Sequence, residues 1–261
     1  MISELAETQA TDVVEEYLET IYRLQSKEGE VAKTSELTRW LKVVPGTVTN
    51  TIERLEKEGY VYHEPYRGVR LTEKGRNVAL QVVRRHRLSE RLLTDILHVD
   101  LGKAHEVACK IEHDIADEEI MGKIEEALGN PKTCPHGNPI PASNGKLGED
   151  ELEVRQLIPL ASLEVSDSGI VERYAEDDPE SLERISSIGL RPGDEIEVVR
   201  KEPDSGDVSV RLGHGAIHVL SKKMAADILV SRTRSPKRQE TRNHRERGSQ
   251  HQRTEFGEYE R

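Results

Sequence analysis

The sequence predicts a mainly α-helical chain with a smaller β part, and three observations carry this prediction. Residues 11–129 place apolar side chains at helical spacing in several segments. Two short β-rich pieces, residues 61–63 and 69–72, interrupt these helices. Residues 153–230 then change character, with short strand patterns separated by turn signals. The length of 261 residues is enough for two or three small domains.

The first 73 residues predict a winged helix-turn-helix. A first helix covers residues 11–25, with Thr11 as its N-cap. Residues 34–43 and 44–61 follow as two short helices around a tight turn that contains glycine. The β-rich pieces after them make a hairpin, with Gly68 at its turn. The expected core face comprises Val13, Tyr17, Ile21, Leu24, Leu37, Trp40, Leu41, Val48, Ile52 and Leu55.

Three further segments complete the expected organisation. Residues 74–141 form a helical domain with helices at 74–97, around 105–113 and at 117–129. Residues 130–151 are rich in proline, glycine and asparagine, which ends the helices, and a linker is expected at 142–152. Residues 153–230 form a small SH3-like β-barrel with one helix that ends at Gly189. Residues 231–261 are polar and basic, and we expect them to be disordered.

Composition indicates a cytoplasmic protein. The chain has two cysteines, no apolar run that would span a bilayer and no N-terminal signal pattern, so no membrane partner is expected. The net charge is −11, but residues 231–261 carry nine arginines and lysines against five glutamates. The remaining body is therefore strongly acidic, which suits a high-salt cytoplasm; an ordinary acidic cytosolic protein is the alternative.

The segment HEVACKIEH, residues 105–113, lines up metal-competent side chains. On a helix, His105, Cys109, Glu112 and His113 share one stripe. A zinc-protease helix is excluded, because no second histidine follows at the required spacing. Neighbouring helices offer two more pairs at helical spacing, and the alternative for each pair is a solvated surface position. These pairs are His86 with Glu90, and Glu16 with Glu19.

Several blocks together resemble one family. EEYLETIYRL, TVTNTIERLEKEGYV, YRGVRLTEKG, RRHRLSERLLTDIL, HEVACKIEH and CPHGNPIP are similar, in order, to the metal-dependent transcriptional repressors of the diphtheria toxin repressor and manganese transport regulator family. The resemblance covers about residues 11–141, and SIGLRPGDEIEVV resembles the SH3-like, FeoA-type domain of the iron-type members. With the acidic composition, this suggests a haloarchaeal iron-type member.

The resemblance implies a homodimer with two metal sites per subunit, both built on the helical domain. The DNA-proximal site would use Glu16, Cys109, Glu112 and His113, with Glu19 as an added carboxylate. The second site would use His86, Glu90 and His105, completed by Glu172 or Glu176. Thiolate and imidazole favour Fe²⁺, whereas the carboxylates favour Mn²⁺. We expect Fe²⁺, with a Mn²⁺-dependent repressor of manganese transport as the alternative.

The expected function is repression of metal-uptake genes through a double-stranded DNA operator, with no small organic substrate and no enzymatic activity. A metalloenzyme or a metal-storage module is the less favoured alternative. Thr47, Thr49 and Asn50 lie at the start of the recognition helix, where they can reach base edges. Tyr66, Arg67 and Arg70 on the wing can hold phosphates. The alternative is that Thr47 is only an N-cap and that the arginines are solvated.

Overall fold

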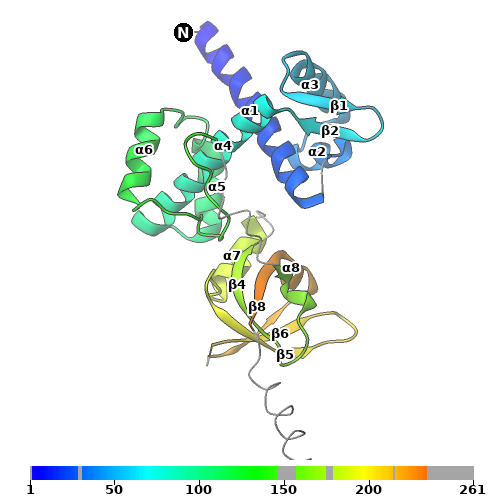
Figure 1. Ribbon diagram of the computed structural model, residues 1–261, viewed down its shortest axis with the longest axis vertical. Helices are drawn as coiled ribbons and strands as arrows, with labels where there is room; N and C mark the ends of the chain where they lie inside the picture. Colours follow the sequence, from blue (N-terminus) through cyan, green and yellow to red (C-terminus); the bar gives the residue numbers. More distant parts are fainter. Residues whose placement is uncertain (1, 29–30, 146–156, 175–178, 214, 234–261) are drawn as a thin grey trace, which may run out of the picture. The chain divides into compact units, whose positions relative to one another are not determined.

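The computed structural model describes residues 2–28, 31–145, 157–174, 179–213 and 215–233 (Figure 1). The chain divides into two compact units, one made of residues 1–155 and 173–192 and the other of residues 156–172 and 193–261. The predicted linker and basic tail lie largely outside the described residues. Within the described ranges, no helix combines the length and apolar character that a bilayer span requires.

The N-terminal helices pack around one apolar core. Helices α1 (Ile2–Glu28), α2 (Thr34–Leu41) and α3 (Pro45–Lys57) surround it, and α2 and α3 form the predicted helix-turn-helix. Lys42 ends α2 in the left-handed conformation, and Pro45 opens α3 at a position where its missing N–H has no helical partner to lose. The most deeply buried core side chains include Leu18, Ile21, Leu37, Val48, Ile52 and Leu55.

Helix α1 differs from its prediction in two details. It begins at Ile2, so Thr11 lies inside the helix and is not its N-cap. Val13 is 41% exposed, whereas Tyr17 is buried, because the core is first contacted at Val14. The apolar stripe was therefore predicted correctly from Tyr17 onwards but extended one turn too far towards the N-terminus.

The wing is an antiparallel hairpin of β1 (Val61–Glu64) and β2 (Gly68–Leu71). The prediction that Gly68 lies at the turn was wrong, because Gly68 pairs with Glu64 and Tyr66 is the left-handed residue of the turn. Glycine is required at 68 for another reason. Its φ is +135°, and a Cβ there would lie 2.3 Å from the carbonyl oxygen of Ala32.

The helical part of the first unit follows the wing. Helices α4 (Glu73–Arg91), α5 (Leu101–Ile111) and α6 (Glu118–Ala127) match the three expected segments, and α1 lies between them and the winged helix (Figure 1). The predicted helix 74–97 is α-helical only to Arg91 and continues as a π-helical turn, Leu92–Ile96. Helix α7 (Pro179–Ser187), which the sequence placed within residues 153–230, packs on α5.

The second unit is built on a six-stranded sheet in the order β3-β8-β4-β5-β6-β7. Its buried face is lined by alternating apolar residues, which is the pattern of a sheet with one face on a core. Strands β4 to β7 match the expected ones, but β3, β8 and helix α8 were not predicted. The bounds are β3 (Ile158–Pro159), β4 (Ser168–Tyr174), β5 (Glu195–Lys201), β6 (Val208–Leu212), β7 (Ile217–Leu220), α8 (Lys222–Asp227) and β8 (Ile228–Thr233).

The core around α3 yields a first prediction. Replacing Ile52, which is 1% exposed, by alanine should lower the free energy of unfolding of this unit by about 2–5 kcal/mol, because the cavity is only partly refilled. The single tryptophan, Trp40, packs against the same core, so its fluorescence in guanidinium titrations reports the change. The control Glu53→Ala, on the exposed side of α3, should stay within about 0.5 kcal/mol. Equal losses in both variants would contradict the assigned core.

Candidate functional site

Three helices bring their polar residues together around His86. Helix α4 supplies His86 and Glu90, which are one turn apart, and α5 supplies His105 and Cys109 with the same spacing. The Oε1 atom of Glu90 lies 2.8 Å from Nε2 of His86 and 2.8 Å from Nδ1 of His105. His86 is 2% exposed and Glu90 is 1% exposed. His86 therefore does not occupy a solvated surface position, which was the alternative.

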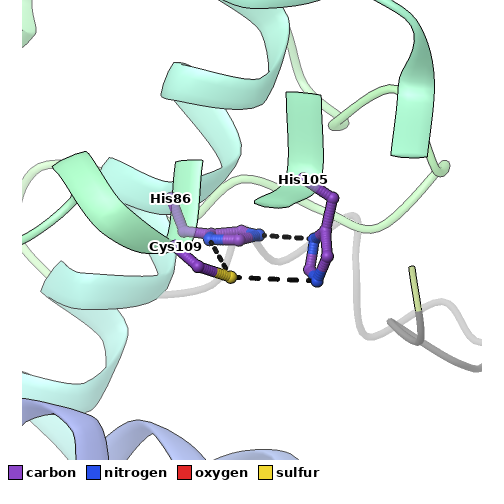
Figure 2. A group of neighbouring side chains, drawn as sticks. All are labelled: His86, His105 and Cys109. Carbon is purple, nitrogen blue, oxygen red and sulfur yellow. Dashed lines mark hydrogen bonds between the residues drawn. The ribbon is translucent and has the colours of Figure 1, made fainter. Parts of the chain in front are cut away.

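Cys109 faces both imidazoles of this cluster (Figure 2). Its Sγ lies 3.9 Å from Nδ1 of His86 and 3.8 Å from Nε2 of His105. These three residues form one group whose ligand atoms all lie within 4.8 Å of one another. Cys109 itself is solvent-exposed, so this side of the cluster is open to an incoming ion.

His86 also joins a carboxylate-rich group. Its Nδ1 lies 2.6 Å from Oε2 of Glu112, and Glu19 from α1 completes a buried set with ligand atoms within 4.8 Å. The sequence had assigned His86 to one site and Cys109 and Glu112 to the other. The structure instead brings all three side chains into contact through the His86 ring.

Two residues of the predicted DNA-proximal set lie at the edge of the cluster. Nδ1 of His113 contacts Glu15, and its Nε2 lies 3.5 Å from Oε1 of Glu112. Glu16 is exposed as a residue, but partial burial of its carboxyl group, together with the charge of Glu19, raises its pKa against the opposing effect of His113. The structure therefore places Glu16 within electrostatic reach of His113, without a hydrogen bond between them among the described contacts.

Sequence reasoning missed Glu15. Its Oε2 accepts a 2.8 Å hydrogen bond from Nδ1 of His113 and a 2.6 Å one from Nη2 of Arg85. The available signal was its spacing of four residues from Glu19, which places both on one face of α1. Arg85 also donates from Nε to the carbonyl oxygen of Glu112 at 2.7 Å. Glu15 and Arg85 thereby connect α1, α4 and the end of α5.

Sequence reasoning also missed Cys134 and His136. Oε2 of Glu90 lies 3.2 Å from Nδ1 of His136, and Sγ of Cys134 lies 3.6 Å from the same nitrogen. The three residues form a second buried group of potential ligands. The available signal was the Cys-x-His spacing in the segment CPHGNPIP, which the sequence analysis used only as a family block.

The electrostatics of the cluster favour the ionised forms of Glu90 and Cys109 and oppose that of Glu112. Burial alone would raise the pKa of Glu90, but the charges of His86 and His136 hold this pKa well below its usual value. Partial burial of the sulfur raises the pKa of the Cys109 thiol, but hydrogen bonds with His105 and His86 outweigh this effect and bring the pKa to about 6. Burial and the charge of Glu19 raise the pKa of Glu112 to about 7. A thiolate beside imidazoles and carboxylates is a donor set that suits a divalent transition metal.

The sequence also predicted ligands from the C-terminal part, Glu172 and Glu176. Glu172 is on β4 in the second unit, where its Oε1 accepts a 2.5 Å hydrogen bond from Ser231. Glu176 lies outside the described residues. Glu172 thus already has a partner within its own unit.

The candidate DNA-contacting residues lie on exposed parts of α3 and the wing. Thr47, Thr49 and Asn50 are exposed, and the N-cap of α3 is Val44, so Thr47 is not its cap. The hydroxyl of Thr49 donates to the carbonyl oxygen of Pro45 at 3.1 Å. The fully exposed Tyr66 stands at the tip of the wing.

The wing arginines are paired with an acidic neighbour. Nη1 of Arg67 lies 3.1 Å from Glu64, and Nε of Arg70 lies 2.6 Å from the same carboxylate. Both arginines therefore have an acidic partner, and the Arg67 side chain is still 75% exposed. One glutamate partly neutralises both of the cations that the sequence assigned to phosphates.

Three family models match the chain in the order of its domains. Residues 9–69 match the iron-dependent repressor N-terminal DNA-binding domain, and residues 72–142 match the iron-dependent repressor metal-binding and dimerisation domain. Residues 158–232 match the FeoA domain, which agrees with the predicted SH3-like part.

Curated relatives and solved structures agree with these models. The chain is 34% identical over 197 residues to a diphtheria toxin repressor of Corynebacterium glutamicum, covering 73% of this chain and 85% of the relative. It is 32% identical over 228 residues to the iron-dependent repressor IdeR of Mycobacterium tuberculosis, covering 85% of this chain and 97% of that relative.

Two solved structures of repressors are similar to the chain along most of its length. A manganese-dependent transcriptional repressor complex with manganese matches with a TM-score of 0.75 at 30% identity, covering 84% of this chain and all of that one. IdeR of T. acidophilum matches with a TM-score of 0.68 at 27% identity, covering 84% and 97%. The chain therefore belongs to the iron-dependent repressor family, and it is a metal-dependent, DNA-binding transcriptional repressor and not an enzyme.

Proposed function

We propose that Fe²⁺ is the activating metal and that each subunit of a homodimer holds two such ions. The observation that carries this proposal is the position of Cys109, whose sulfur faces two imidazole rings at 3.8 and 3.9 Å. A thiolate with imidazoles favours Fe²⁺ over Mn²⁺. The group of Glu19, His86 and Glu112 supports the alternative, a Mn²⁺-dependent repressor, because oxygen donors suit Mn²⁺.

The proposed ligands for the two ions form two sets, drawn from α1, α4 and the region of α5. Glu16, Glu19, Cys109, Glu112 and His113 would hold the DNA-proximal ion. A second set, His86, Glu90 and His105, would hold the other, with Glu172 or Glu176 as further candidates. Cys109 of the first set faces His86 and His105 of the second, and His86 also contacts Glu112, so the two sets adjoin and the two occupancies are expected to be coupled.

Control of DNA binding follows from the position of α1. This helix carries Glu15, Glu16 and Glu19 on one side and packs against α2 and β2 of the winged helix. When bound, a divalent cation would neutralise these carboxylates and link α1 to α4 and α5. The ligands on α4 and α5 belong to the part that matches the dimerisation domain, so α1 would set the spacing of the two recognition helices.

The proposed output is repression of metal-uptake genes in the cytoplasm. Thr47, Thr49 and Asn50 would read base edges in the major groove, and Tyr66, Arg67 and Arg70 would position the wing on phosphates. The basic segment after residue 231 would add contacts that are independent of sequence and sensitive to salt.

The ligand role of Cys109 is directly testable. Cys109→Ala should abolish Fe²⁺-dependent binding to a duplex selected by the metal-loaded wild type, while the dimer persists in sedimentation. Lys110→Ala is the matched control, because Lys110 is exposed and pairs only with Glu106 among the described contacts. Unchanged metal dependence in the cysteine variant would show that Cys109 is not a ligand.

Base reading by Asn50 is tested by specificity. Asn50→Ala should weaken binding to the selected duplex by about 1–3 kcal/mol and affect a random duplex much less. Arg70→Ala is the contrast, because losing a phosphate contact should weaken both duplexes to a similar extent. Fluorescence anisotropy at one fixed salt concentration gives both affinities. Equal losses for Asn50→Ala on the two duplexes would remove it from the base-reading set.

Metal preference is expected to depend on residue 109. Cys109→Glu replaces the thiolate by a carboxylate beside Glu19, Glu112 and His113, so the response should shift from Fe²⁺ towards Mn²⁺. The measurement is the concentration of each ion that half-saturates DNA binding under anaerobic conditions. An unchanged ratio would mean that residue 109 does not set selectivity. A wild type that responds better to Mn²⁺ would overturn the preference for iron and leave the repressor assignment intact.

A further inference from the structure

We propose that Glu64 competes with DNA phosphates for the wing arginines and so lowers the affinity of the winged helix for any duplex. The inference rests on the proposed role of Arg67 and Arg70 in holding phosphates. Both guanidinium groups already contact the carboxylate of Glu64, at 3.1 and 2.6 Å. A phosphate offers the same kind of charged oxygen acceptor, so it would bind to the same two groups.

The turn of the wing brings Arg67 to the carboxylate. The N–H of Arg67 donates to the carbonyl oxygen of Glu64 at 3.0 Å, which closes a four-residue β-turn. Pro65 and Tyr66 occupy its two central positions, and Tyr66 has a φ of +64°, as is usual for a type II turn. The first and fourth residues of a β-turn are close in space. The local sequence Glu-Pro-Tyr-Arg therefore places the two charges side by side.

Strand pairing brings Arg70 to the same carboxylate from the other strand. The register pairs Tyr62 with Arg70, and Glu64 follows Tyr62 by two residues. Glu64 and Arg70 therefore lie on one face of the hairpin, as diagonal neighbours. This register is held by two hydrogen bonds of 2.9 Å between the backbones of Val69 and Ala32. The contact between the two side chains is thus set by the fold of the wing.

Glu64 is the least exposed member of this group. Its side chain is 22% exposed, whereas those of Arg67 and Arg70 are 75% and 41% exposed. A phosphate that approaches from solvent would meet the arginines with the carboxylate still beside them. Charges closer than the Debye length, about 8 Å at physiological salt, are not fully screened. The carboxylate would therefore repel the phosphate even when its ion pairs with the arginines open.

Such a competitor acts on affinity and not on the choice of sequence. Phosphates carry no direct sequence information, so the loss should be similar for the operator and for any other duplex. The alternative is that Glu64 only stabilises the hairpin. Removing its charge would then disturb the wing and weaken DNA binding, whereas removing a competitor strengthens it. The two roles therefore predict effects of opposite sign.

The test uses the full chain and a fluorescein-labelled duplex of random sequence, in anisotropy titrations over a series of salt concentrations. Glu64→Gln removes the charge and keeps the size of the side chain. The variant should bind this duplex about 3- to 10-fold more tightly at low salt, and the slope of log affinity against log salt should steepen by about 1–2, as one or two additional phosphate contacts would require. A duplex selected by the wild type should gain by a similar factor. Unchanged or weaker binding would overturn the proposal.

The matched control is Glu119→Gln. Glu119 lies on α6, outside the winged helix, and its carboxylate pairs with Lys123 at 2.5 Å. This variant removes the same charge from an ion pair, so it should leave the affinity and the salt slope unchanged. An equal gain in both variants would assign the effect to net charge and overturn the role of Glu64. The gain for Glu64→Gln should appear in the metal-free and in the anaerobic Fe²⁺-loaded chain, so it is independent of the proposed corepressor.

A double variant, Arg67→Gln with Arg70→Gln, separates this inference from the proposed role of the wing. It should bind the random duplex less tightly than the wild type, and adding Glu64→Gln to it should no longer steepen the salt slope. A double variant that binds as the wild type does would overturn both the phosphate role of the wing and the competition. Weakened binding in the double variant, together with no effect of Glu64→Gln alone, would overturn the competition and leave the phosphate role intact.

Discussion

The carboxylate of Glu90 is the constraint on which the rest of the site depends. It is 1% exposed, and a buried carboxylate is strongly unfavourable unless cations or hydrogen-bond donors surround it. His86 and His105 approach one of its oxygens, and His136 approaches the other. These three contacts require α4, α5 and the turn at 133–139 to meet at one point. The same contacts of Glu90 therefore determine both how the helical part packs and which side chains meet at the candidate metal centre.

His86 transmits this constraint towards the DNA-binding part. One of its nitrogens contacts Glu90, and the other lies 2.6 Å from Glu112. Glu112 is in turn close to His113, which contacts Glu15 on α1. A change in charge at Glu90 would thus reach α1 through a short series of contacts, in which His86 and Glu112 are buried and His113 and Glu15 are half-buried. This is the physical basis for expecting the occupancies of the proposed sites to be coupled.

The sequence was most informative where the spacing of residues within a single helix determines which side chains share a face. Helical spacing predicted the core face of α3 and the pairing of His86 with Glu90, because both follow from the geometry of one helix. It did not predict that His86 meets Glu112, since periodicity says which residues share a face and not which faces meet. Gly68 shows a similar limit. Its need for glycine arises from the carbonyl oxygen of Ala32, which is distant in sequence.

The wing adds a second level of control to the proposed mechanism. Glu64 pairs with both Arg67 and Arg70, and the chain as a whole has a net charge of −11. Both features weaken attraction to arbitrary DNA, because non-specific affinity comes from uncompensated positive charge near phosphates. A single DNA-binding domain would therefore hold DNA poorly on its own. Stable binding would require both domains of a dimer to engage together, and the proposed link between α1 and the helical part supplies that geometry. An acidic repressor with a partly neutralised wing would thus depend more on its metal than a basic one would.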